Sequence, residues 1–122
     1  MPDEASGRSG PLPPLKIQWF HILMALSREP LHGSGIVRDV LEQTDERLRL
    51  WPATLYGSLE ELASLGWIEE LTEDGDFPEG ESRRKRIYRL SAAGREVLEA
   101  EAERMGLLAR TALARLASES TP

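Results

Sequence analysis

Apolar residues recur at helical spacing in three segments of the first half of the chain. The segment 15–27 carries two apolar stripes, which predicts a helix that packs against partners on two sides. After a turn at His32-Gly33-Ser34-Gly35, a second helix with one apolar side is expected to run to about Thr44.

A third helix is predicted to start at Pro52, because the missing amide of proline would be unpaired in the first turn anyway, and to end before Gly66. Its apolar positions predict a buried face, which consists of Leu55, Leu59, Leu62 and Leu65. The remaining positions predict an outward face, which consists of Tyr56, Gly57, Ser58, Glu60 and Glu61.

Two β-type segments and one long helix follow. Residues 67–71 and Lys85–Leu90 predict a two-stranded ribbon, since a loop rich in glycine, proline and acidic residues separates them. Ser91 is suited to cap the last helix, which is predicted to run to about Ala117. Apolar residues in this helix have the spacing of a coiled-coil seam. The seam consists of Leu98, Ala102, Met105, Ala109, Ala112 and Leu116. We expect it to bind a second copy of the chain, and the alternative is packing within its own chain.

This order of elements predicts a mainly α fold with a small β ribbon, namely a winged helix-turn-helix followed by a carboxy-terminal dimerisation helix. Residues 1–14 are rich in proline, glycine and serine, so we expect a disordered tail. Residues 15–90 would form the winged domain, 91–117 the dimerisation helix, and 118–122 a flexible tail.

Composition narrows the function. The 122 residues contain no cysteine and two histidines, so neither a metal site nor a cofactor is expected. No nucleophile with a base and no phosphate-binding glycine loop is recognisable, so we do not expect an enzyme. The lack of a long apolar run and of a signal sequence predicts a cytoplasmic protein without a membrane partner. Because the formal net charge is −6, nucleic-acid binding would require local clusters of cations.

One such cluster lies in the second β-type segment. Residues 83–89 contain five cations and no anion, directly after an acidic stretch. At the base of a hairpin, these cations are expected to contact the phosphates of double-stranded DNA. The alternative is a charge run that is merely solvated.

Several short motifs lie between residues 15 and 117. They are Leu31-His32-Gly33, Leu48-Arg49-Leu50, Pro52-Ala53-Thr54-Leu55-Tyr56, Gly66-Trp67-Ile68 and Tyr88-Arg89-Leu90-Ser91-Ala92-Ala93-Gly94. With these motifs the chain resembles the PadR family of bacterial transcriptional regulators. The resemblance implies a homodimeric repressor that binds a palindromic operator and is released by a small ligand. The single short last helix resembles the smaller subfamily, in which that helix mediates dimerisation.

The resemblance also implies roles for single residues. Thr54, Tyr56 and Ser58 would stand at the start of the recognition helix, with Arg83, Arg84 and Lys85 on the wing. The predicted DNA-binding set consists of His32, Ser34, Thr54, Tyr56, Gly57, Ser58, Arg83, Arg84 and Lys85.

This sequence departs from the family pattern near the third helix. Ser34 stands where tyrosine is usual, Trp51 where a capping serine is usual, and Gly57 where proline is frequent. Glu60 and Glu61 replace a commonly basic stretch. Two interpretations stay open: an unusual operator read with help from Arg28, Arg47 or Arg49, or DNA contact weaker than is usual in the family.

Two further alternatives concern ligands and partners. Trp19, Leu23 and Met105 are the candidate lining of a pocket for a small hydrophobic or aromatic effector, and the alternative for Trp19 is ordinary packing. The net charge and the acidic third helix favour the competing function, a winged-helix module that binds proteins rather than a specific DNA sequence.

Overall fold

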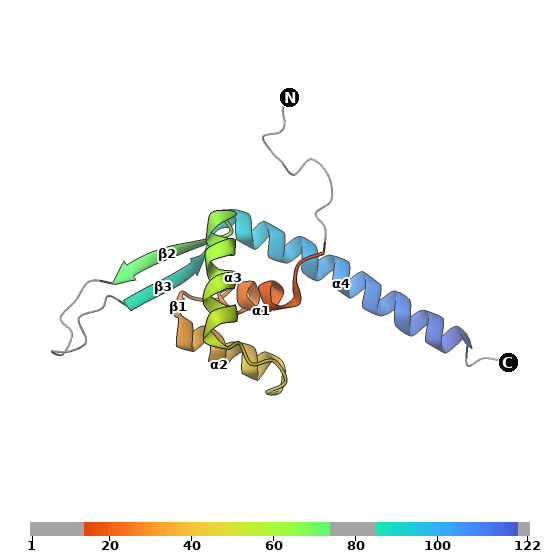
Figure 1. The fold of residues 1–122 in the computed structure, drawn as a ribbon. Coiled ribbons are helices and arrows are strands. Elements are labelled where there is room, and N and C mark those ends of the chain that lie inside the picture. The colour runs from red at the N-terminus through yellow and green to blue at the C-terminus, as the bar shows by residue number, and fades with distance from the viewer. Residues whose placement is uncertain (1–13, 74–84, 120–122) are drawn as a thin grey trace, which may run out of the picture.

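The computed structural model describes residues 14–73 and 85–119, which form four helices and a small antiparallel sheet (Figure 1). The elements follow in the order α1 (Ile17–Ala25), β1 (Leu31–His32), α2 (Gly33–Gln43), α3 (Pro52–Ser64), β2 (Ile68–Glu73), β3 (Lys85–Leu90) and α4 (Ala92–Glu119). The expected fold class, three helices followed by a β hairpin and a long helix, is therefore confirmed. None of the described helices is long and apolar enough to cross a membrane.

Two expectations at the start of α2 and at the end of α4 are wrong. The predicted turn at His32-Gly33-Ser34-Gly35 is instead the end of β1 and the first turn of α2. At the other end of the chain, α4 continues to Glu119, so residues 118 and 119 are helical rather than part of a flexible tail. The predicted tails at 1–13 and 120–122 lie outside the described residues.

The ribbon has a third strand that the sequence analysis did not predict. β3 lies in the middle of the sheet, and β1 and β2 pair with it in antiparallel register. β1 has only two residues, Leu31 opposite Tyr88 and His32 opposite Ile87. A strand this short has no periodicity of its own, so only its pairing with β3 defines it.

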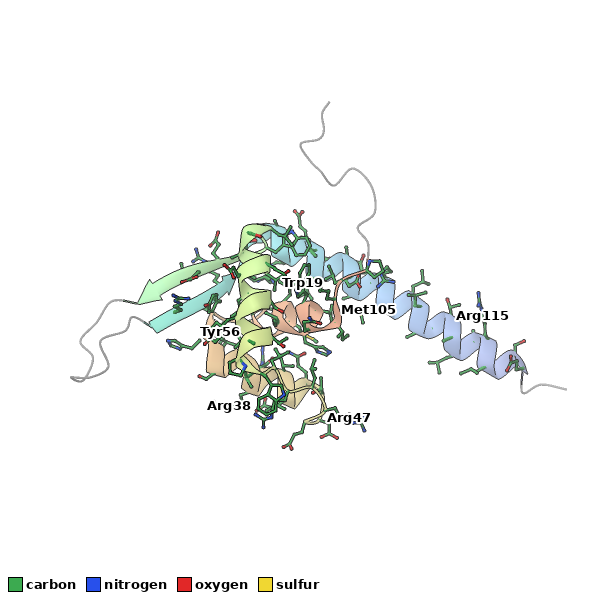
Figure 2. The ribbon with its side chains drawn as sticks, viewed as in Figure 1. Trp19, Arg38, Arg47, Tyr56, Met105 and Arg115 are labelled. Carbon is green, nitrogen blue, oxygen red and sulfur yellow. The ribbon has the colours of Figure 1, made fainter. Side chains whose placement is uncertain are left out.

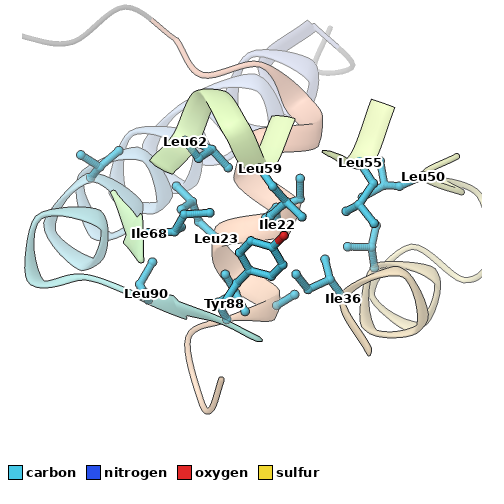
Figure 3. Packing of buried hydrophobic residues seen from close by; sticks show 14 residues of the cluster. Ile22, Leu23, Ile36, Leu50, Leu55, Leu59, Leu62, Ile68, Tyr88 and Leu90 are labelled. Carbon is cyan, nitrogen blue, oxygen red and sulfur yellow. The ribbon is translucent and has the colours of Figure 1, made fainter. Parts of the chain in front are cut away.

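The hydrophobic core lies where α1, α2 and α3 meet the sheet (Figure 3). Ile22 and Leu23 of α1 are completely buried, and the Tyr88 ring of β3 lies in the middle of the cluster. Burial raises the pKa of the Tyr88 hydroxyl above its usual value of 10.0, and the Glu70 carboxylate adds to the rise. The other core members are Ala25, Leu26, Ile36, Val40, Leu50, Leu55, Leu59, Leu62, Ile68, Leu90 and Val97.

The junction between the winged domain and α4 is built around Ser91 and Gly94. The Ser91 hydroxyl accepts a hydrogen bond from the Gly94 amide at 3.0 Å, which confirms Ser91 as the amino-terminal cap, and donates one to the Gly66 carbonyl at 2.7 Å. A Cβ atom at position 94 would lie 1.9 Å from the Trp67 carbonyl oxygen. Glycine at this position therefore lets α4 begin in direct contact with the start of β2.

Only the first half of α4 packs on the domain. Val97 and Glu101 are buried against the region of α1, and the Glu101 carboxylate accepts hydrogen bonds from the Leu15 amide at 3.4 Å and from Arg104. The 28 residues of α4 span about 42 Å, and its second half extends beyond the domain (Figure 1). The exposed large apolar side chains of this extension are Leu107, Leu108, Leu113 and Leu116.

Candidate nucleic-acid interface

The side of α3 that faces away from the core carries small and polar residues. Thr54, Tyr56 and Gly57 are exposed in its first half, and Glu60 and Glu61 follow in the second half. Ser58 is only 4% exposed and lies on the buried side with Leu55, Leu59 and Leu62. The expectation that Ser58 faces outward is wrong, because the helical repeat turns this position toward the core. The expectation that Leu65 is buried is also wrong, because α3 ends at Ser64 and Leu65 is 49% exposed.

Tyr56 lies over the beginning of α2. A Cβ atom at Gly33 would be 2.7 Å from the Tyr56 hydroxyl oxygen, so the absence of a side chain at Gly33 allows this close approach. Ser34 is exposed in the first turn of α2, while His32 is half-buried at the end of β1. No side chain caps the start of α2 and no acid lies in its first turn, so its first amides suit an anion.

Trp51 and Arg49 form an exposed pair directly before α3. The indole of Trp51 is 65% exposed, and the Arg49 guanidinium lies 5.3 Å from its centroid. Trp51 occupies the capping position of α3 without a side-chain cap, and Pro52 follows as the first helical residue. The sequence analysis named both residues but missed the pair. The sequence feature that could have revealed the pair is the spacing of two residues in an extended segment, which puts both side chains on one face.

Two of the five predicted arm cations are engaged inside the hairpin. Arg89 of β3 lies opposite Glu69 of β2, and its guanidinium donates two hydrogen bonds to that carboxylate, at 2.6 and 3.0 Å. Arg86 pairs with Glu70 at 3.5 Å. Lys85 starts β3, whereas Arg83 and Arg84 lie outside the described residues. Of the arm that was expected to contact phosphates, Arg86 and Arg89 therefore already pair with acids of β2.

Further arginines surround the beginning of α3. Arg38 on α2 and Arg47 on the link to α3 are exposed, and Figure 2 shows both at the end of the domain where α3 begins. Arg28 pairs with Asp39 at 3.6 Å. Of the arginines considered as helpers, Arg47 and Arg49 lie nearest to α3 in the chain. Arg38 was missed, because only the tertiary fold brings α2 beside the α3 start.

The predicted dimerisation seam divides into two parts. Leu98 packs on the hydrophobic core of its own chain, and Met105 is half-buried. The other seam residues are exposed, namely Ala102 between these two and Ala109, Ala112 and Leu116 beyond them. Packing within the chain therefore explains Leu98 and part of Met105. It does not explain the apolar residues of the seam from Ala109 onward.

The three residues of the candidate effector pocket have different surroundings. Leu23 is completely buried in the core. Trp19 contacts Trp67 edge to face at 5.9 Å between ring centroids, and the Lys16 ammonium lies 4.9 Å from the Trp19 ring. The Trp19 indole nitrogen is buried and has no hydrogen-bond partner among the described residues. A pocket formed by Trp19, Leu23 and Met105 stays a prediction.

The described part of the chain contains no group of three side chains that could hold a metal ion. Near the exposed face of α3 lie the starts of α2 and α3, which have no side-chain caps, and the β2–β3 hairpin. Residues 22–100 match the model of the transcriptional regulator PadR-like family. The chain belongs to this PadR-like family. The matched range runs from α1 into α4, so it includes α3, the hairpin and the Ser91–Gly94 junction.

Solved structures of other regulators have the same fold as this PadR-like chain. A transcriptional regulator from Clostridium thermocellum superposes with a TM-score of 0.66 at 22% identity, over 79% of this chain and 89% of that one. Bacillus subtilis PadR in complex with operator DNA superposes with a TM-score of 0.61 at 21% identity, over 73% of this chain and 48% of that one. At these identities the likeness establishes the fold.

A curated relative is closer in sequence but much longer. It is an uncharacterised 37.1 kDa protein in a transposon of Streptomyces fradiae, 39% identical over 87 residues. The match covers 71% of the PadR-like chain and 22% of the relative, so the chain spans about a fifth of that protein's length.

Proposed function

We propose that this PadR-like chain is a sequence-specific DNA-binding regulator, and that it acts in the cytoplasm as a homodimeric repressor responsive to a small hydrophobic or aromatic ligand. The observation that carries the proposal is the free first half of α3, with Thr54, Tyr56 and Gly57 exposed beside the uncapped start of α2. The operator complex of Bacillus subtilis PadR, which has this fold, supports it.

In the proposed complex, α3 enters the major groove and the hairpin follows the phosphate backbone. Thr54 and Tyr56 contribute hydroxyl groups that hydrogen-bond base edges or phosphates. His32 and Ser34 bring the start of α2 to a phosphate, which its free amides and helix dipole favour. Arg83, Arg84 and Lys85 neutralise phosphates at the wing.

A salt titration of duplex binding tests this function. Arg84→Ala and Lys85→Ala should weaken operator and unrelated duplexes about equally, and each should reduce the slope of log K against log salt by about 0.9. Arg89→Ala is the matched control, because the Glu69 carboxylate already engages Arg89. We expect a smaller change in slope for this variant.

The competing function is a protein-binding winged helix, which the net charge of −6 and the exposed acids of α3 favour. Full-length protein that binds no duplex even at low salt would support this competing function and contradict ours. Salt-dependent binding without any preference between operator and unrelated DNA would contradict sequence specificity.

The exposed second half of α4 supports the proposed dimer. Leu113 and Leu116 are 67% and 61% exposed, and no part of the described chain covers them. A winged domain reads one half-site, so a twofold partner bound through α4 would give the second reading helix that a palindromic operator requires. The hairpin and the α4 extension leave the domain on opposite sides (Figure 1), so an α4 dimer leaves the hairpin free for DNA.

Trp19 supports the proposed ligand response. Its buried indole N–H lacks an acceptor among the described residues, which is costly unless another molecule supplies one. α1, which carries Trp19, packs on α4. A ligand that binds there in one arrangement of α4 shifts the dimer toward that arrangement, and so changes the spacing of the two reading helices.

A further inference from the structure

The outermost surface of α3 is a narrow stripe formed by Ala53, Gly57 and Glu60. The three positions are spaced by four and three residues, so they lie on one side of the helix. All three are exposed, whereas the buried side of α3 contains Leu55, Ser58, Leu59 and Leu62. We call Ala53, Gly57 and Glu60 the α3 stripe. Its first two members have almost no side chain, and its third has a long acidic one.

The internal packing of the protein does not require a glycine at position 57. Apart from its own helix backbone and chain neighbours, a Cβ atom there would have no heavy atom of the described residues within 4 Å, and the backbone is ordinary α-helix. Glycine inside a helix is less favourable than alanine, because it loses more backbone freedom on folding. Gly57 therefore weakens the helix without giving space to another described residue. The space that its missing side chain leaves suits a partner that approaches the helix axis closely.

Glu60 is the only charged member of the α3 stripe. It makes no ion pair or hydrogen bond within the part of the chain that the structure describes, whereas the adjacent Glu61 pairs with Lys16 of the α1 start at 3.6 Å. A lone carboxylate in the major groove is repelled by the phosphates. The cytosine amino group at N4 is a base-edge donor with which a carboxylate commonly pairs there.

We propose that the α3 stripe reads DNA by close approach, with Gly57 and Ala53 admitting the helix to the groove floor and Glu60 accepting a hydrogen bond from the N4 amino group of a cytosine. This inference rests on the proposed DNA-binding function. Glu60 then acts as a specificity-determining residue in two ways. It stabilises the complex with the matching cytosine, and its repulsion from the phosphates weakens complexes with every other sequence.

Glu60→Ala tests the cytosine contact, because it removes the acceptor oxygens, one of which a glutamine would keep. Glu61→Ala is the matched control that removes the same charge one residue away. An operator is first selected from random duplexes with the unmodified full-length protein, and each of its base pairs is then exchanged in turn. With the unmodified protein, exchange of one cytosine in each half-site should weaken binding about tenfold or more. With Glu60→Ala the same exchange should have little effect, and unrelated duplexes should bind several-fold more tightly.

Gly57→Ala tests close approach. The variant should melt at a higher temperature than the unmodified protein, because alanine favours the helix and its Cβ atom clashes with no other described residue. It should nevertheless bind the operator at least about tenfold more weakly, since the added methyl group separates the helix from the groove floor. A more stable protein with weaker DNA binding is an outcome that a purely structural role of Gly57 does not produce.

The outcomes separate this inference from the function on which it rests. If the unmodified protein binds no duplex, the proposed DNA-binding function is wrong and the inference with it. If it binds an operator, three results would overturn the inference alone: Glu60→Ala keeps the cytosine preference, Glu61→Ala loses that preference equally, or Gly57→Ala binds as tightly as the unmodified protein.

Discussion

Replacing Ala109 by glutamate should separate the proposed dimer into monomers. Ala109 is exposed on the α4 extension, and the exposed large apolar side chains on its side of the helix are Leu113 and Leu116, at 67% and 61% exposure. Full burial of a leucine contributes about 1.5–3 kcal/mol, so covering the exposed part of each contributes about 1–2 kcal/mol. A twofold interface counts every residue twice, which gives about 4–8 kcal/mol of gross stabilisation from these leucines.

The substitution works against this stabilisation without affecting the domain. Each protomer would bring an unpaired carboxylate into the apolar seam, at a cost of several kcal/mol unless the seam opens. We expect the dissociation constant of the dimer to rise at least about a hundredfold, equivalent to about 2.8 kcal/mol. Ala109 is not part of the hydrophobic core, so the helical content of the monomer should stay the same.

Ala114→Glu is the matched control, since Ala114 is also exposed on α4 but lies about 140° around the helix from Ala109. Light scattering over a dilution series from micromolar protein gives the oligomeric state. Fluorescence anisotropy with a two-half-site duplex gives the affinity for DNA. Ala109→Glu should be monomeric and bind this duplex weakly, whereas Ala114→Glu should behave as the unmodified protein. A monomeric unmodified protein, or a dimeric Ala109→Glu variant with normal DNA binding, would refute the reasoning.

Three further outcomes follow from the structure. Gly94→Ala should destabilise the protein by about 3 kcal/mol or more in denaturant titrations, because its Cβ atom would lie 1.9 Å from the Trp67 carbonyl oxygen. Gly106→Ala is the control, and it should be neutral or stabilising because the nearest atom to its Cβ would be 3.6 Å away. The hydrogen bond from Arg104 holds the pKa of Glu101 below its usual 4.5, so Glu101 stabilises the fold above that pH and loses the effect as the pH falls through the lowered value. Glu101→Gln should therefore unfold more easily than the unmodified protein at pH 7, and a stability difference that does not shrink in acid would contradict this assignment. In a Trp51→Phe, Trp67→Phe background, a planar aromatic ligand should quench Trp19 emission and weaken operator binding, whereas no quenching across a broad panel of such ligands would leave Trp19 as a packing residue.

The sequence by itself determined the elements whose signals are local. Pro52 predicts the start of α3, Ser91 predicts the cap of α4, and the pattern of residues 85–90 predicts β3 with its observed bounds. These predictions succeed because a proline amide, a capping hydroxyl and β-favouring side chains act on their own neighbours in the chain. The order of these elements was sufficient for the fold class.

The tertiary structure decided the features that depend on a distant partner. β1 is a strand only because Leu31 and His32 pair with β3, more than fifty residues later. Arg86 and Arg89 belonged to a uniform basic arm in the sequence, until the hairpin register placed them beside Glu70 and Glu69. Charge that appears free along the chain is neutralised when strands pair.

The candidate interface depended on both kinds of information. The sequence supplied α3 and most of its outward residues, but it placed Ser58 on the wrong side, because the direction of a helix face is set by packing on neighbouring elements. Only the structure distinguished Glu61, which pairs with Lys16, from Glu60, which has no partner in the described chain. The two adjacent acids are equivalent in the sequence, and they differ in the protein because α3 packs with one of them facing α1.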